Sequence, residues 1–292
     1  MWKTRAVVVM MMMMFQPTAS AVGDMLRDER LPVRGHVVGG ENAGDSEFPS
    51  QLALQVRRPG EETQHRLVCG ASILNEHWAL TAAHCVEPRL HEVDSLSVVS
   101  GTTSLSYGGT RHQLSGVLVH PGYDPVNFWR HDIALLKVVE PFRLDGSKVA
   151  PARLPRQDQT VPVDAVATVV GWGLVEEGGT TPSERLQKAE LRVTSRRDCK
   201  AAYDKIDGVI HDTNLCAGVA DGSAGPCKVT MRRIRVKLEP EWSPAQGDSG
   251  GPLFVGGKLV GLTSWGAGCK SRFPAVFTRV ACYVDWIQQH IQ

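Results

Sequence analysis

The 292-residue chain lacks an excess of charge of either sign, because 32 Lys and Arg residues stand against 31 Asp and Glu residues. A net charge of +1 argues against electrostatic attraction to nucleic acid or to an anionic membrane. The sequence also has no internal repeat, and its low-complexity content is limited to the methionine tract at 10–14. We therefore expect neither a nucleic-acid partner nor a repeat architecture.

Long apolar runs are also missing. A membrane-spanning helix needs about 20 apolar residues, and the run at 6–15 has about half that length. It follows the basic residues Lys3 and Arg5 and precedes the small residues Ala19-Ser20-Ala21. This pattern predicts a secretory signal peptide at 1–21 that is removed on export, so we expect a secreted, extracellular protein without a membrane anchor.

The next segment, 22–36, is polar and charged, with no apolar periodicity and no cysteine. We interpret it as a propeptide that is released once it is cut. The remainder, 37–292, has enough residues for one all-β domain with two lobes or for two small domains.

Three motifs carry the candidate chemistry. They are GDSGGP at 247–252, TAAHC at 81–85 and DIALL at 132–136. A serine hydroxyl is unreactive at neutral pH unless a general base and a group that orients this base accompany it. Taken singly, the first motif could be a surface turn, His84 a half-buried structural histidine and Asp132 a strand-end cap. Together they predict Ser249 as nucleophile, with His84 and Asp132 activating it.

With VVGG at 37–40 and SWG at 264–266, the chain resembles the chymotrypsin-like (trypsin/chymotrypsin) serine proteases from Val37 to its C-terminus. The resemblance implies an all-β fold of two six-stranded antiparallel barrels, at about 50–150 and 151–280, with a C-terminal helix at 283–291. The active site is then a cleft between the barrels.

The pattern of the sequence itself predicts many short strands, which is typical of barrels. The expected strands are 51–56, 78–82, 96–101, 116–120, 133–138, 167–173, 186–193, 253–255, 258–265 and 275–280. Gly256-Gly257 is a two-residue hairpin signal, and we find helical spacing only in the tail.

The resemblance also implies the roles of the site residues. His84 takes the proton of Ser249 during attack on the peptide carbonyl and returns it to the leaving amine, while Asp132 orients His84. The backbone N–H groups of Gly247 and Ser249 form the oxyanion hole. Residues Ser264-Trp265-Gly266 pair with an extended substrate as an added strand.

Three pocket residues set the expected specificity: Gly225 at the floor, Gly266 at the entrance and Ala275 on the deep wall. None is charged, whereas a preference for Lys or Arg requires a carboxylate that pairs with the buried cation. We predict a secreted endopeptidase that cleaves after Phe, Tyr or Leu. Its expected partners are protein or peptide substrates, an activating protease and protein inhibitors, and we expect a monomer.

Activation by a cut before Val37 is implied, because the new ammonium group would pair with Asp248 and order the oxyanion turn. The residue before the cut is His36, whereas family members are commonly cut after Arg or Lys. A cut at Arg34 would leave an overhang of about 7 Å. Two routes to Val37 are therefore left open: an unusual protease cuts after His36, or a cut at Arg34 is followed by removal of the dipeptide.

The seven cysteines suggest disulfides with one cysteine left over, and their spacing alone cannot pair them. The resemblance implies Cys69–Cys85, Cys199–Cys216 and Cys227–Cys269, so Cys282 is expected to be a small buried free thiol. No metal site is expected, because no ligand has zinc spacing to Cys282.

No cofactor is implied either. The loop at 101–109, where relatives bind calcium, contains no carboxylate, and calcium prefers such hard oxygen ligands. We therefore predict no calcium requirement.

The largest departure from the family pattern lies beside the nucleophile. Eighteen residues, 229–246, separate Cys227-Lys228 from Gly247, and their removal would restore CKGDSGGP. The segment is basic and contains two prolines; its end codons are compatible with a retained intron, and the alternative is a genuine loop that regulates the cleft. We predict that it loosens the pocket and the oxyanion turn, which leaves a weakly active or non-catalytic homologue as the alternative function.

Overall fold

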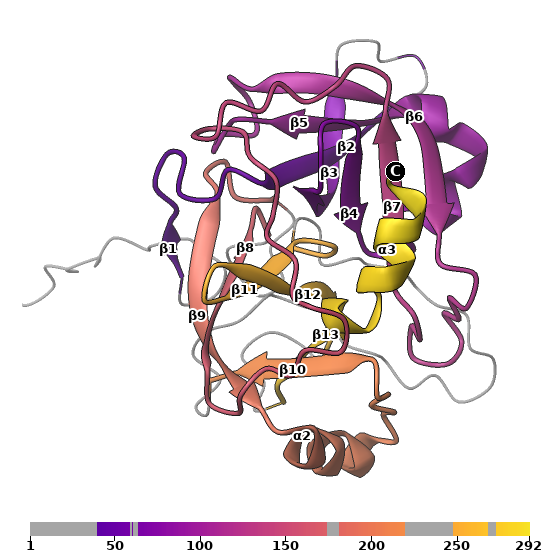
Figure 1. Ribbon diagram of the computed structural model, residues 1–292, viewed down its shortest axis with the longest axis vertical. Coiled ribbons are helices and arrows are strands. Elements are labelled where there is room, and N and C mark those ends of the chain that lie inside the picture. Colours follow the sequence, from indigo (N-terminus) through magenta and orange to yellow (C-terminus); the bar gives the residue numbers. More distant parts are fainter. Residues whose placement is uncertain (1–39, 59, 61–63, 174–180, 220–247, 268–272) are drawn as a thin grey trace, which may run out of the picture. The chain divides into compact units, whose positions relative to one another are not determined.

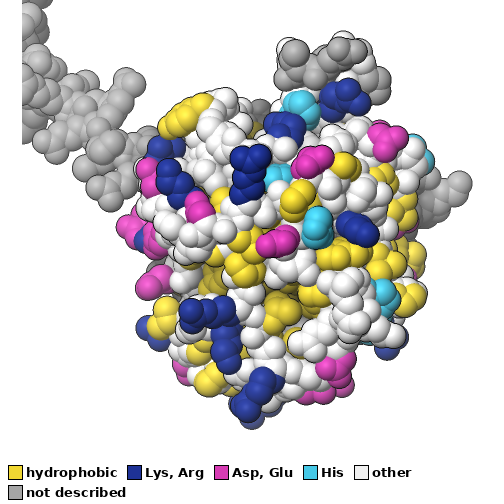
Figure 2. Space-filling model, turned by 45° about the horizontal axis from the view of Figure 1, so that its top comes forward, with side chains coloured by type: hydrophobic (Ala, Val, Ile, Leu, Met, Phe, Trp, Pro, Cys, Tyr) yellow, Lys and Arg dark blue, Asp and Glu magenta, His cyan; other side chains and the backbone are white. Residues whose placement is uncertain are grey.

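A computed structural model describes residues 40–58, 60, 64–173, 181–219, 248–267 and 273–292. The predicted signal peptide, the propeptide and the segment 229–246 lie outside these residues. Among the helices in these ranges, none has the length and apolar character needed to cross a membrane. Acidic and basic side chains are intermingled on the face that Figure 2 shows, in agreement with the balanced charge.

Six strands form the first barrel: β2 (Gln51–Arg57), β3 (His65–Ile73), β4 (Trp78–Thr81), β5 (Leu96–Ser100), β6 (Thr110–Val119) and β7 (Ala134–Val138). They close in the order β2-β3-β4-β7-β6-β5, with antiparallel pairing throughout (Figure 1). Leu52, Leu54, Ile73, Leu96 and Leu136 fill its core, where each is fully buried.

The second barrel contains β8 (Val166–Gly171), β9 (Gln187–Thr194), β10 (Asn214–Gly218), β11 (Pro252–Val255), β12 (Lys258–Trp265) and β13 (Ala275–Arg279). Its strands follow the order β9-β10-β13-β12-β11-β8, and pairing of β8 with β9 closes it. The short strand β1 (Glu41–Asn42) adds to β9. Two closed antiparallel barrels confirm the predicted fold class.

A third apolar cluster joins the two barrels and positions the site. Ile133 and Leu135 of the first barrel pack with Leu259 and Leu262 of β12 and with Ile287 of α3 (Val284–His290). Figure 1 shows α3 returning from the second barrel to lie alongside the first. The carbonyl oxygen of Ile291 accepts a hydrogen bond from the side chain of Asn75 (3.1 Å), so the C-terminal segment is fixed to the first barrel.

Several sequence-based expectations about single elements were wrong. We predicted neither β3 nor β10, and β6 begins at Thr110 instead of residue 116. The helices α1 (Ala83–Val86) and α2 (Arg196–Tyr203) were also missed. Only Cys199 and Tyr203 of α2 are buried, too few for a visible apolar period. The sequence feature that could have revealed α2 was its N-cap residue, Ser195. The Oγ atom of Ser195 accepts a hydrogen bond from the N–H of Asp198 (3.1 Å).

The hairpin prediction at Gly256-Gly257 is confirmed. Both glycines have positive φ, 56° and 72°, and Val255 pairs with Lys258 across the turn. Two positive φ angles are the requirement of the tight turn that matches the twist of the flanking strands, and glycine adopts them without steric cost.

Candidate active site

His84 and Asp132 lie in direct contact. The Nδ1 atom of His84 is 2.7 Å from Oδ2 of Asp132, and the backbone N–H of His84 donates to Oδ1 at 2.9 Å. With Nδ1 turned toward the carboxylate, Nε2 is the ring nitrogen that remains for a reacting group. The pair therefore has the arrangement in which a carboxylate fixes the tautomer of a general base.

The Asp132 carboxylate is held from a second side by β12. Ser264 donates its hydroxyl proton to Oδ2 at 2.5 Å, and Thr278 of β13 donates to the backbone carbonyl of Asp132 at 2.7 Å. Burial by itself raises the pKa of Asp132, but the charge of His84 and the hydrogen bonds from His84 and Ser264 outweigh it and lower the pKa below its ordinary value. Asp132 therefore stays ionised although it is only 1% exposed.

The short helix α1 presents His84 directly after β4, and a disulfide fixes it. Cys85 bonds to Cys69 of β3, with the Cα atoms 6.1 Å apart. The second disulfide joins Cys199 of α2 to Cys216 of β10. These are two of the three pairings that the resemblance implies. The third, Cys227–Cys269, lies outside the described residues. The thiol of Cys282 is free, as expected, but it is half-buried instead of buried, and this burial raises its pKa.

The turn that carries Ser249 packs against the segment that leads to His84. The carbonyl oxygen of Ser249 accepts a hydrogen bond from the N–H of Gly70 in β3 (2.8 Å), and Gly250 has a φ of 70°. A Cβ atom on Gly250 would overlap the side chain of Thr81 and would lie 3.0 Å from Sγ of Cys85. The structure thus brings the Ser249 turn against the neighbours of His84 in sequence.

Asp248 occupies a cradle between two glycines of the second barrel. The N–H of Gly173 donates to its Oδ1 atom at 2.9 Å, and a Cβ atom on either Gly171 or Gly173 would overlap the carboxylate. Asp248 is 1% exposed, so its charge requires close partners. Val37 and Gly247, the expected activation and oxyanion residues, lie outside the described residues.

Part of the expected pocket wall lies among the described residues. Ser264 and Trp265 end β12, Gly266 follows them, and Ala275 begins β13 opposite Ala217. The floor residue Gly225 lies outside the described part of the chain.

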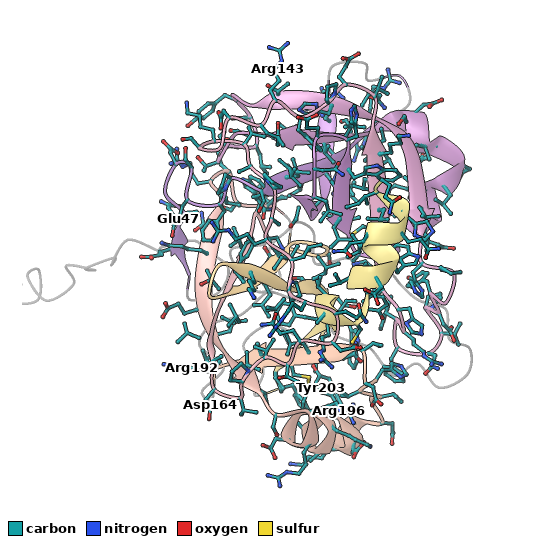
Figure 3. The ribbon with its side chains drawn as sticks, viewed as in Figure 1. Glu47, Arg143, Asp164, Arg192, Arg196 and Tyr203 are labelled. Atoms are coloured by element: carbon teal, nitrogen blue, oxygen red, sulfur yellow. A yellow bond between two sulfur atoms is a disulfide. The ribbon has the colours of Figure 1, made fainter. Side chains whose placement is uncertain are left out.

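Trp265 is the centre of an aromatic cluster that the sequence did not reveal. Its ring lies 4.9 Å from that of Tyr203, 5.5 Å from that of Phe128 and 6.2 Å from that of Trp129, measured between centroids. Tyr203, labelled in Figure 3, comes from α2 and donates its hydroxyl proton to the carbonyl oxygen of Pro274 (2.8 Å). In the sequence, the only hint of this cluster was the pair of aromatic residues Phe128-Trp129 shortly before Asp132.

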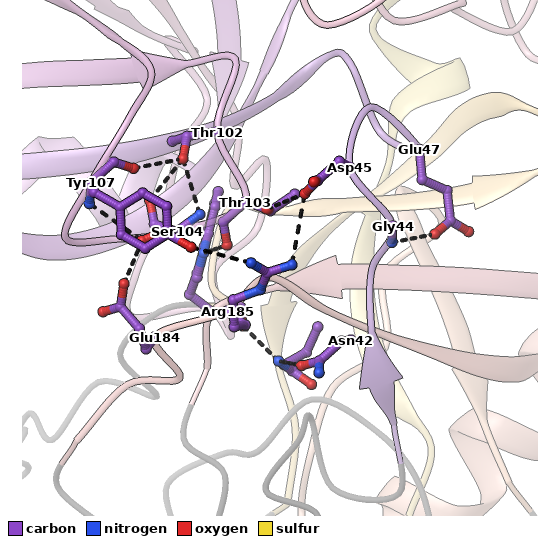
Figure 4. A network of polar contacts seen from close by, with 12 residues as sticks. Asn42, Gly44, Asp45, Glu47, Thr102, Thr103, Ser104, Tyr107, Glu184 and Arg185 are labelled. Atoms are coloured by element: carbon purple, nitrogen blue, oxygen red, sulfur yellow. Dashed lines mark hydrogen bonds and ion pairs between the residues drawn. The ribbon is translucent and has the colours of Figure 1, made fainter.

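The loop at 101–109 receives carboxylates from elsewhere in the chain, as Figure 4 shows. Glu184 accepts hydrogen bonds from the hydroxyl of Ser104, from the N–H of Ser106 (3.1 Å) and from the hydroxyl of Ser106 (2.7 Å). Asp45 accepts one from Thr103 (2.8 Å). A calcium site needs carboxylate oxygens directed at the ion, whereas the Glu184 oxygen here is directed at three donors. The described residues of this loop therefore do not fit calcium.

One group of potential metal ligands occurs among the described residues: Cys69, His84 and Cys85. The two sulfur atoms are joined in a disulfide, so they cannot act as thiolate ligands. This group gives no support to a metal centre.

Comparison with known proteins agrees with this geometry. The family model described as Trypsin matches residues 37–229 and 229–287. The chain belongs to the trypsin family of serine proteases. The two matched segments of this trypsin-family chain meet at residue 229, where the predicted insertion begins.

Two similar relatives are called trypsins. Trypsin Blo t 3 of Blomia tropicalis is 32% identical over 256 residues, which cover 87% of this chain and 85% of that protein. Trypsin-1 of Astacus astacus is 35% identical over 261 residues, or 86% of this chain and 98% of that protein. Among solved structures, neuropsin, a serine protease expressed in the limbic system of mouse brain, matches with a TM-score of 0.69 and 31% identity. That match covers 87% of this chain and 99% of the neuropsin chain.

Proposed function

We propose that the protein is a secreted endopeptidase in which Ser249 attacks the peptide carbonyl. His84 accepts the proton of Ser249 and returns it to the leaving amine, while Asp132 orients His84. The observation that carries this proposal is the buried contact of 2.7 Å between His84 Nδ1 and Asp132 Oδ2, next to the packed Ser249 turn. Backbone N–H groups of Gly247 and Ser249 would stabilise the oxyanion, each contributing about 3 kcal/mol to the transition state.

Labelling with a fluorophosphonate probe tests this proposal. After activation, the probe should attach to Ser249, because only an activated serine reacts at a useful rate. Ser249→Ala should abolish labelling and peptide hydrolysis together. Labelling that persists in Ser249→Ala, or its absence from the activated parent chain, would refute the assigned mechanism.

For specificity we propose cleavage after Phe, Tyr or Leu, supported by the absence of charge at Gly225, Gly266 and Ala275. A second candidate is cleavage after Lys or Arg, which the name of the trypsin relatives favours. The values of kcat/KM on matched peptides that differ only in Phe or Arg at the cleaved position separate the two. A higher value for Arg would mean that a carboxylate outside these three positions pairs with the cation.

Activation is proposed to expose Val37, whose ammonium group would pair with Asp248 in its glycine cradle. N-terminal sequencing of the active form should give Val37. An active form that begins at Gly35 would overturn this assignment, because the extra dipeptide keeps the amine about 7 Å from the required position.

The alternative function is a weakly active or non-catalytic homologue, in which residues 229–246 disturb Gly225 and Gly247. This alternative is supported by the break of the family match at residue 229.

A further inference from the structure

His131, the residue before Asp132, has a left-handed backbone conformation with a φ of 55°. Its carbonyl oxygen accepts a hydrogen bond from the N–H of Ile133 (2.8 Å), which closes a tight turn around Asp132. A positive φ is uncommon for residues other than glycine and persists where surrounding contacts hold it. The direction of the Asp132 side chain therefore depends on the contacts that fix His131.

Two side chains hold the imidazole of His131. Its Nδ1 atom shares a hydrogen bond of 2.9 Å with the hydroxyl of Tyr283, which is 3% exposed and precedes α3. The opposite contact is with His120 at the end of β6, whose ring stacks on that of His131 with centroids 4.9 Å apart and planes 23° apart. His131 is thus held between the first barrel and the C-terminal segment.

Gly122 closes the space around the two rings. Its N–H donates to Nδ1 of His120 (3.1 Å), so this nitrogen of the neutral ring carries no proton. A Cβ atom on Gly122 would lie 2.9 Å from Cδ2 of His131 and 3.3 Å from Nδ1 of His120. The position of the His131 ring therefore depends on the absence of a side chain at Gly122.

We propose that His131 is a positioning residue for Asp132, and that its contacts with Tyr283 and His120 fix the turn that directs the Asp132 carboxylate at His84. The inference rests on the proposed function, because it assigns a role to the orientation of Asp132. Misplacement of a reacting or orienting group by about 1 Å can lower a rate by about 100-fold, so even a small rotation of this turn has a measurable effect.

Tyr283→Phe is the mildest probe, since it removes one hydroxyl and keeps the aromatic packing. We expect kcat per titrated Ser249 to fall about 3- to 10-fold while KM changes by less than about 2-fold, the signature of an interaction lost in the transition state. Gly122→Ala, which displaces the rings without touching the hydroxyl, should likewise lower kcat and leave KM nearly unchanged.

Variants of His131 itself test the backbone conformation. His131→Asn should retain more activity than His131→Ala, because asparagine tolerates a positive φ. His77→Gln, at an exposed histidine whose backbone hydrogen bonds go to Asn75 and Val138, should behave as the parent chain.

A spectroscopic measurement separates this inference from the proposed function. The proton shared by His84 Nδ1 and Asp132 lies in a short charge-assisted hydrogen bond and should give a far-downfield proton resonance in the full activated chain. Tyr283→Phe and Gly122→Ala should shift or broaden it, whereas His77→Gln should not. If the contacts of His131 had only a structural role, the variants would lower the melting temperature and the fraction of titratable Ser249 but would leave kcat per site and the resonance unchanged. That result would overturn the inference.

Failure of the proposed function would look different. If the parent chain does not label at Ser249, the proposed function fails, while the resonance still tests the positioning of Asp132.

Discussion

Gly250 packs against Thr81 so closely that a methyl group at Gly250 would overlap the threonine hydroxyl. Gly250 follows Ser249, and Thr81 lies three residues before His84 at the end of β4. The hydroxyl of Thr81 donates to the carbonyl oxygen of Gly70 (2.8 Å), whose own N–H donates to the carbonyl oxygen of Ser249 (2.8 Å). The two barrels therefore meet directly at the Ser249 turn, which makes the spacing between serine and histidine a property of their packing.

Gly250→Ala should consequently remove activity. The substitution forces alanine into a φ of 70° and places its methyl group against Thr81, so we expect kcat/KM to fall by at least about 100-fold and the melting temperature to fall with it. Gly256→Ala is the matched control, because its φ is also positive, at 56°, but no heavy atom lies within 4 Å of its added Cβ atom. If both variants lose the same amount of stability and Gly250→Ala stays active, the overlap with Thr81 has no role.

The candidate catalytic residues could be proposed from the sequence because each of them lies inside a local motif. TAAHC, DIALL and GDSGGP point to His84, Asp132 and Ser249 as candidates from strings of five or six letters, and the structure brings two of them, His84 and Asp132, into contact. The aromatic cluster around Trp265 could not be found in this way, because Phe128, Trp129 and Tyr203 come from distant segments and meet only after both barrels have closed.

The same limit applies to the loop at 101–109, because the carboxylate that contacts the loop comes from a distant part of the sequence. The loop has no carboxylate of its own, yet Glu184, about 80 positions away, supplies one. The missed strand β3 has a related cause. Its residues 69–73 are buried on both faces, so its second half shows no alternation of apolar and polar residues for a period-2 pattern to reveal.

Glu184→Gln tests the interaction that stabilises this loop. Burial raises the pKa of Glu184, but hydrogen bonds from Ser104 and Ser106 more than compensate, so the pKa is lowered and the carboxylate is ionised at neutral pH. Loss of its charge should weaken three hydrogen bonds at a largely exposed site, which we expect to lower the free energy of unfolding by about 1 kcal/mol. Differential scanning calorimetry should show a lower melting temperature for Glu184→Gln and no change for Glu190→Gln, an exposed residue of β9.

EDTA provides the complementary measurement. Because hydroxyl and amide donors already satisfy Glu184, we expect chelation to change neither activity nor melting temperature. A large loss of either in EDTA would mean that a cation binds this loop, and the interpretation of Glu184 would then be wrong.

The His120 ring should make the fold sensitive to acid. Burial, together with the charges of His131 and His290, lowers the pKa of His120 from its ordinary 6.5 to about 4. Between these two values the unfolded chain binds more protons than the folded chain, so the stability from neutral His120 is complete above pH 6.5 and is lost as the pH falls toward 4. Solvent screening of this half-buried ring limits the loss to about 1 kcal/mol.

Urea unfolding of Ser249→Ala, which cannot digest itself, measures this effect between pH 7 and pH 4. His120→Gln in that background should flatten the decline of stability with falling pH, whereas His77→Gln should leave it unchanged. An equally steep decline in His120→Gln would show that other groups, such as His131, whose pKa is also lowered, cause the acid sensitivity.

The last prediction concerns residues 229–246. The downstream half of the Ser249 turn is fixed by hydrogen bonds from the N–H of Gly250 to Thr263 and from the N–H of Thr263 to Gly251 (2.8 and 2.9 Å), so a disturbance must reach the serine from the side of Gly247. In the sequence the segment joins the chain on that side, between Lys228 and Gly247, the proposed oxyanion residue. Its removal restores CKGDSGGP and should free Gly247 to donate its hydrogen bond.

We therefore expect deletion of 229–246 to raise kcat/KM on a Phe peptide by at least about 10-fold, since one oxyanion donor is worth about 100- to 1,000-fold in kcat. Both forms should be activated identically and normalised by fluorophosphonate titration, and the deletion in a Ser249→Ala background controls for a contaminating protease. A deletion that leaves kcat/KM equal would mean that the segment is a tolerated loop. A deletion that lowers kcat/KM would mean that the loop is part of the working cleft, since a passive insertion has no contact through which its loss could harm the serine.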